Sequence, residues 1–129
     1  MRASRLALLA LVVACRSKSG AASLGEVPVV APFDAMHLPT AGGVVWECDA
    51  TRMKIVYDGG DKSALGDRYG HALEQLGWTS GQPVAESGQQ WLERLDRGHE
   101  VLTLDVHDAD FRGAVPHGVE VFLSIEQAR

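Results

Sequence analysis

The sequence predicts an α+β domain in which one helix packs on a mostly antiparallel sheet of about five or six strands. Several short segments alternate apolar with polar residues, and one segment carries apolar residues at helical spacing. Turn signals that contain glycine or aspartate separate these segments. The expected order of elements along the chain is β-β-α-β-β-β-β.

The first two strands are expected at residues 44–48 and 53–57. Apolar side chains recur at alternate positions in both segments, and the turn-like residues 49–51 lie between them. Two alternating segments joined by so short a turn are typical of a β-hairpin.

The helix is expected to follow this hairpin. Its N-cap is Asp61 or Ser63, and Gly77 is its C-terminal cap. The apolar residues at helical spacing are Leu65, Tyr69, Ala72, Leu73 and Leu76. Gly66 and Gly70 weaken a helix by up to about 1 kcal/mol each relative to alanine, so packing against a sheet must hold it in place.

Four further strands are expected at residues 79–85, 90–95, 100–107 and 119–125. The second of these has a helical alternative, because Trp91, Leu92 and Leu95 are spaced as on a helix face. A strand is preferred, since Gly88 and Gly98 leave too few residues between them for a stable helix.

The first 14 residues are predicted to be a signal peptide. Arg2 and Arg5 give a positively charged start, and residues 6–14 have apolar side chains only. As a helix this run would be roughly 14 Å long, against about 30 Å of hydrocarbon in a bilayer, so it is too short for a permanent membrane span.

The residues Val12-Val13-Ala14-Cys15 resemble the lipobox of bacterial lipoproteins, with valine where leucine is more usual. The resemblance implies cleavage before Cys15, a diacylglycerol thioether on its sulfur and acylation, for example with palmitate, of its new amino group. Arg16 follows the cysteine instead of aspartate, which implies the outer membrane if the cell is Gram-negative. The alternatives are an ordinary cleaved signal and a buried strand with an incidental cysteine.

Three parts are therefore expected: a signal peptide at residues 1–14, a lipid-anchored tether at residues 15–39, and one small domain at residues 40–129. The tether is expected because residues 16–39 begin with small and polar side chains, contain three prolines and sustain no period. Without its leader the chain of 129 residues keeps about 115, enough for one core.

Charge and cysteine content limit the possible partners. The net charge is −5, and loss of Arg2 and Arg5 makes it −7, which argues against binding to nucleic acid or to anionic lipid. Cys48 is the second of two cysteines. It is expected to be a buried free thiol if Cys15 carries lipid, and the alternative is a disulfide between the two in an unlipidated protein.

The strongest candidates for a site are Asp105 and His107, which share one face of a predicted strand about 7 Å apart. With Asp110 or His117 from the next loop they are candidate metal ligands, although a tetrahedral site needs three or four convergent groups. A polar solvent face that continues through Asp108 into an acidic loop is the simpler interpretation. We therefore assign no metal or other cofactor.

Motifs of the common enzyme classes are missing. His99-Glu100 begins like a metalloprotease motif, but Thr103 stands where the second histidine is needed. No nucleophile elbow, phosphate loop or CxxC pair occurs. Three tryptophans are candidates for a ligand pocket, although each fits a core position as well: Trp46, Trp78 and Trp91.

The sequence thus favours a lipid-anchored envelope protein with a small non-catalytic domain, which binds a protein or cell-wall partner at the membrane. The alternative is a small periplasmic metal- or ligand-binding module that uses Asp105 and His107.

Overall fold

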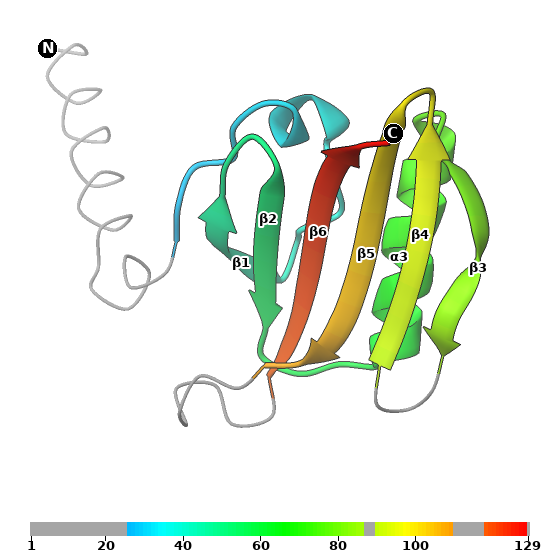
Figure 1. Ribbon diagram of the computed structural model, residues 1–129. Coiled ribbons are helices and arrows are strands. Elements are labelled where there is room, and N and C mark those ends of the chain that lie inside the picture. Colours follow the sequence, from blue (N-terminus) through cyan, green and yellow to red (C-terminus); the bar gives the residue numbers. More distant parts are fainter. Residues whose placement is uncertain (1–25, 87–89, 110–117, 129) are drawn as a thin grey trace, which may run out of the picture.

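The computed structural model describes residues 26–86, 90–109 and 118–128. Along the chain these residues form a short 3₁₀ helix, two strands, one α-helix and four more strands (Figure 1). The elements are η1 (Phe33–Met36), β1 (Gly43–Cys48), β2 (Arg52–Tyr57), α3 (Lys62–Gln75), β3 (Thr79–Glu86), β4 (Gln90–Arg97), β5 (Glu100–Asp108) and β6 (Val119–Gln127). The predicted α+β class is confirmed, and the helical alternative for β4 is wrong.

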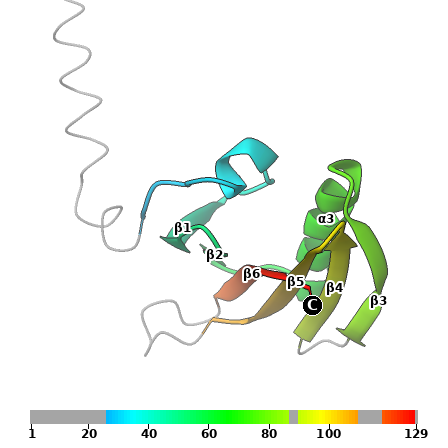
Figure 2. The same ribbon diagram turned by 45° about the horizontal axis from the view of Figure 1, so that its top comes forward.

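All six strands join one antiparallel sheet in the order β1-β2-β6-β5-β4-β3. After the β1–β2 hairpin, α3 carries the chain to the far edge of the sheet, and β3 to β6 return strand by strand until β6 pairs with β2. Figure 2 shows η1 and α3 on the same face, with η1 near β1 and β2 and α3 over β3 to β5. No helix of the described residues lies on the other face, and we call it the open face.

Local sequence signals explain where α3 begins and ends. The side chain of Asp61 accepts a hydrogen bond of 2.9 Å from the Ser63 amide, as an N-cap does. Gly77 has a φ of +98°, and the amides of Gly77 and Trp78 donate to the carbonyls of Glu74 and Leu73. This is a Schellman ending, so both predicted caps are confirmed.

The predicted turn between β1 and β2 is also held by a side chain. The Asp49 carboxylate accepts hydrogen bonds from the amides of Thr51 and Arg52 at 2.8 and 2.9 Å. These two bonds, led by the one from Thr51, hold the pKa of Asp49 below its usual value. The predicted turn at residues 49–51 is therefore confirmed, and the structure shows that it has Asx geometry.

The core lies between the helices and the sheet. Alternate residues of the strands face it, and those with less than 2% of their surface exposed include Met53, Ile55, Leu95, Leu102, Leu104, Val106, Val121 and Leu123. From the helix side the buried residues of α3 are Leu65, Gly66, Tyr69, Gly70 and Leu73. Leu76, expected on this face, is 37% exposed, because it is the C-cap and lies outside the helix.

The predicted boundary between tether and domain at Thr40 needs correction. Phe33, Met36 and Leu38, which fall in the predicted tether, are only 1%, 7% and 9% exposed and belong to the hydrophobic core. The Val27 amide also donates to the Val45 carbonyl of edge strand β1 at 2.9 Å. The folded domain therefore includes residues 26–39, and any tether is confined to residues 16–25, outside the described part.

Two tyrosines connect this N-terminal segment to α3. The hydroxyls of Tyr57 and Tyr69 lie 2.7 Å apart, and Tyr57 also donates to the Pro39 carbonyl at 3.1 Å. Burial is the main cause that raises the pKa of each tyrosine above its ordinary value. The two tyrosines thus form a buried hydrogen-bonded pair, and its stabilising effect requires that both hydroxyls are protonated.

Stability should fall at alkaline pH, and Tyr69→Phe should weaken that fall. Because burial raises both folded-state pKa values, the unfolded chain ionises first; the stabilisation is complete below about pH 10 and is lost as the pH rises further. Urea unfolding of the wild type and of Tyr69→Phe, at neutral pH and at about pH 11, measures the difference. Equal losses in both proteins would show that Tyr69 does not contribute.

Candidate functional site

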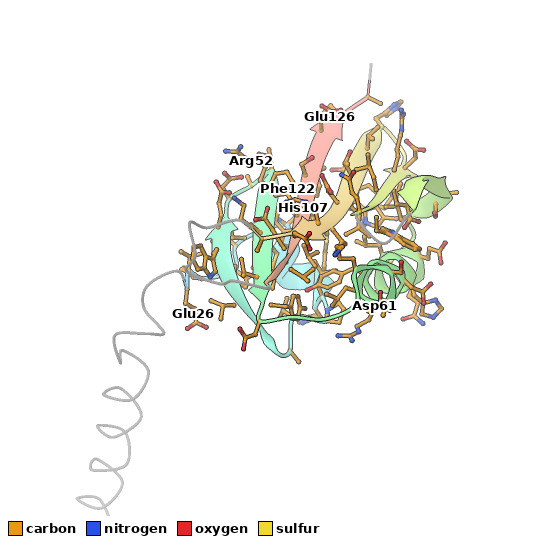
Figure 3. All side chains as sticks on the ribbon, turned by 90° about the horizontal axis from the view of Figure 1, so that it is seen from below. Glu26, Arg52, Asp61, His107, Phe122 and Glu126 are labelled. Carbon is orange, nitrogen blue, oxygen red and sulfur yellow. The ribbon has the colours of Figure 1, made fainter. Side chains whose placement is uncertain are left out.

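The open face of the sheet carries a line of polar side chains from neighbouring strands. Residues of β2, β5 and β6 that do not face the core point here, and Figure 3 shows Arg52, His107 and Phe122 on the side of the sheet opposite to Asp61 of the α3 cap. We call the connected polar residues of this face the open-face cluster: Glu47, Lys54, Gln90, Asp105, His107 and Glu120.

His107 lies at the centre of the open-face cluster. Its Nδ1 is 3.0 Å from Oδ1 of Asp105, and its Nε2 is 3.2 Å from Oε2 of Glu120. The strand register explains this geometry, because His107 pairs with Glu120 across β5 and β6, and Asp105 lies two residues earlier on the same face. An ionised carboxylate only accepts hydrogen bonds, so both ring nitrogens donate together only when the imidazole is protonated.

Further contacts extend the cluster across five strands, from β1 to β4. Lys54 Nζ lies 3.9 Å from Glu120 Oε2 and 3.7 Å from Glu47 Oε1, and Gln90 donates to Asp105 Oδ1 at 3.0 Å. The side chains of His107 and Asp105 are 34% and 24% exposed, whereas that of Glu120 is 9% exposed. Exposed ion pairs contribute only about 0–1 kcal/mol each, so these contacts chiefly fix where the side chains point.

The structure brings the two predicted site residues together but does not arrange them as metal ligands. Asp105 and His107 are in contact, and Glu120 is a third member that the sequence did not indicate. Both nitrogens of His107 already face carboxylates, and within the described ranges no group of three or more His, Cys, Asp or Glu side chains is placed to hold an ion. Asp110 and His117 lie outside the described residues.

Neighbouring candidates have other contacts. Asp108 forms an ion pair of 2.8 Å with Lys62 at the start of α3, so it points away from the cluster. His99 is exposed in the β4–β5 turn, and His71 lies on the exposed side of α3, 3.4 Å from the Gln75 amide nitrogen.

The tryptophans divide between core and surface. Trp78 and Trp91 are 2% and 9% exposed and belong to the core, and the guanidinium of Arg97 covers the Trp78 ring at 4.4 Å from its centre. Trp46 is half-buried where the register of β1 against β2 shifts between Val45 and Glu47. The preference for core positions is therefore confirmed for two of the three.

Cys48 is half-buried at the edge of the core and forms no disulfide with any residue that the structure describes. Its sulfur accepts a hydrogen bond of 3.4 Å from the Val30 amide. Cys15 lies outside the described residues, so the predictions of its lipidation and of its disulfide alternative stay predictions.

Comparison of the chain with models of protein families, with curated proteins and with solved structures found no match. Among the described residues, no helix is both long and apolar enough to span a membrane. The open-face cluster must therefore be interpreted from its own chemistry.

Proposed function

We propose that this protein is a lipid-anchored component of the bacterial cell envelope, attached through Cys15, and that its domain binds a protein or cell-wall partner without catalysing a reaction. The observation that carries the proposal is the order of features in residues 1–15: positive charge, apolar run, small residue and cysteine. Two or more acyl chains would hold the protein durably, whereas a single chain binds only marginally.

The length of chain between anchor and domain is compatible with this role. The described fold begins at Glu26, so residues 16–25 separate Cys15 from it. Fully extended, ten residues reach roughly 35 Å, which is enough to place the domain beyond the lipid headgroups. The net negative charge of the chain, −5, favours a partner other than the anionic membrane surface.

The geometry of the open-face cluster supports binding over catalysis. A general base must offer a free nitrogen to a proton of the substrate, but both nitrogens of His107 face carboxylates of the protein. What the cluster does offer is a fixed arrangement of charges on a solvent-facing sheet, as binding surfaces do.

If the cell has two membranes, we propose that the protein lies at the outer one, because Arg16 and not aspartate follows Cys15.

Cys15→Ala should release the protein from the membrane, because lipid can be attached only to its thiol. We expect the wild type to sediment with membranes and the variant to remain in the soluble or unprocessed fraction, with no incorporation of an alkyne-tagged fatty acid. Cys48→Ala is the matched control and should behave as the wild type. Equal labelling and sedimentation of Cys15→Ala and wild type would contradict the anchor.

A further inference from the structure

A second polar site lies on the opposite side of the sheet, where β4 faces α3. Alternation along β4 directs Trp91, Glu93 and Leu95 toward the helix. Glu93 is only 4% exposed, yet it is a carboxylate. Its Oε1 accepts a hydrogen bond of 3.1 Å from the Trp91 indole, and its Oε2 accepts one from the Ser80 hydroxyl.

The charge of Glu93 has no counter-charge among the described residues. Its carboxylate oxygens contact two neutral donors, the Ser80 hydroxyl and the Trp91 indole N–H, and no lysine, arginine or histidine of the described residues forms an ion pair with it. A buried carboxylate that is not paired with a cation is costly, and such carboxylates are rare in proteins.

A pocket of about 210 Å³ opens beside Glu93. The residues that line it are Asp67, Gly70, His71, Glu74, Trp91 and Glu93, so its walls are one face of α3 and the inner face of β4. Asp67 and Glu74 are exposed at its rim, which adds two carboxylates to the buried one.

Glycine at position 70 keeps the space beside the carboxylate open. A Cβ atom there would lie 2.9 Å from Glu93 Oε1, closer than real Cβ atoms approach an oxygen. Gly70 is buried in the middle of α3, where glycine is less favourable than alanine. The helix therefore has an unfavourable residue at the point where any larger side chain would press on the Glu93 carboxylate.

We propose that this pocket binds a single organic cation, the alkylammonium or guanidinium group of a lysine-like or arginine-like ligand. Three carboxylates and an indole wall are the groups that attract such cations, through charge-assisted hydrogen bonds and contact with the aromatic ring. The volume is below the roughly 300–1,000 Å³ of pockets for drug-sized ligands, so it suits one side chain. This binding does not depend on lipidation of Cys15.

The test uses the full chain in detergent micelles and follows the Trp91 indole N–H by NMR during titration with Nα-acetyl-lysinamide and Nα-acetyl-argininamide. We expect saturable shifts with at least one of them and none with Nα-acetyl-norleucinamide, which has a similar shape but no charge. Glu93→Gln should weaken binding by at least about tenfold, since it removes the buried charge. Glu126→Gln, at an exposed position of β6, is the matched control and should change nothing.

A second variant keeps the test decisive if Glu93→Gln does not fold. Asp67→Asn combined with Glu74→Gln changes only exposed rim residues and should weaken binding several-fold, more at low salt than at high salt. Binding that is unchanged by the rim variant, equal shifts with norleucinamide, or saturation of the pocket by Ca²⁺ or Zn²⁺ in place of the amines would each overturn the proposal. Butylammonium titrated alone distinguishes the source: equal affinity indicates a free amine, and weaker affinity indicates a side chain carried by a peptide.

Discussion

Replacing Phe33 by alanine should lower the free energy of unfolding by about 3–5 kcal/mol. Phe33 lies before the first strand, in a segment whose sequence resembles a linker, yet it is 1% exposed and packs into the core beneath η1. Truncation would leave a cavity between η1 and the sheet that the rigid core cannot fill. Urea unfolding monitored by circular dichroism measures the loss.

Val30→Ala is the matched control for Phe33→Ala. Val30 belongs to the same segment but is 38% exposed, so its truncation should cost no more than about 0.5 kcal/mol. If both variants lost equally little free energy of unfolding, residues 26–39 would not belong to the cooperative unit. The domain would then begin at Thr40, as the sequence predicts.

Gly66→Ala should destabilise the protein by about 1–3 kcal/mol, although alanine is the better helix former by about 1 kcal/mol. A Cβ at Gly66 would lie 2.3 Å from Cγ of Trp91, and this atom is too close to the backbone of β4 to move aside easily. The helix and the sheet would have to separate locally. Thermal or urea unfolding shows whether Gly66→Ala is less or more stable than the wild type.

A comparison at a second glycine and a double mutant isolate the cause. Gly81→Ala, where a Cβ meets no atom within 4 Å, should be neutral or slightly stabilising. In a Trp91→Leu background the cost of Gly66→Ala should shrink, because the clashing ring is gone. A stabilised Gly66→Ala variant would show that the close packing of α3 on β4 is wrong.

The elements that the sequence predicted correctly depend on local signals. Asp61 at the start of α3 and Gly77 at its end form hydrogen bonds with residues a few positions away. Asp49 shapes the first hairpin in the same way. Alternation along each strand likewise follows from the burial of one face of the sheet. These signals can be read without knowing how distant parts of the chain meet.

The features that were missed depend on contacts between distant residues. The pairing of β6 with both β2 and β5 places the last strand in the middle of the sheet, and no local pattern encodes that choice. Phe33, Met36 and Leu38 lie in a 3₁₀ turn and irregular chain, so their burial follows no regular period.

The candidate sites show the same division. Alternation along β5 placed Asp105 and His107 on one face, and the structure has them 3.0 Å apart. Glu120 reaches His107 only through the β5–β6 register, and Glu93 is buried only because α3 packs over β4. The sequence did indicate close packing at one place, because α3 contains two glycines, Gly66 and Gly70. Both lie against β4 in the structure.

The most direct test of the central proposal is the intact mass of the protein extracted from membranes of a bacterium that expresses the full chain. We predict a chain that begins at Cys15 and carries the added mass of a diacylglycerol and an amide-linked acyl group. An unmodified chain that begins at any other residue, or one that retains residues 1–14, would contradict lipid anchoring at Cys15.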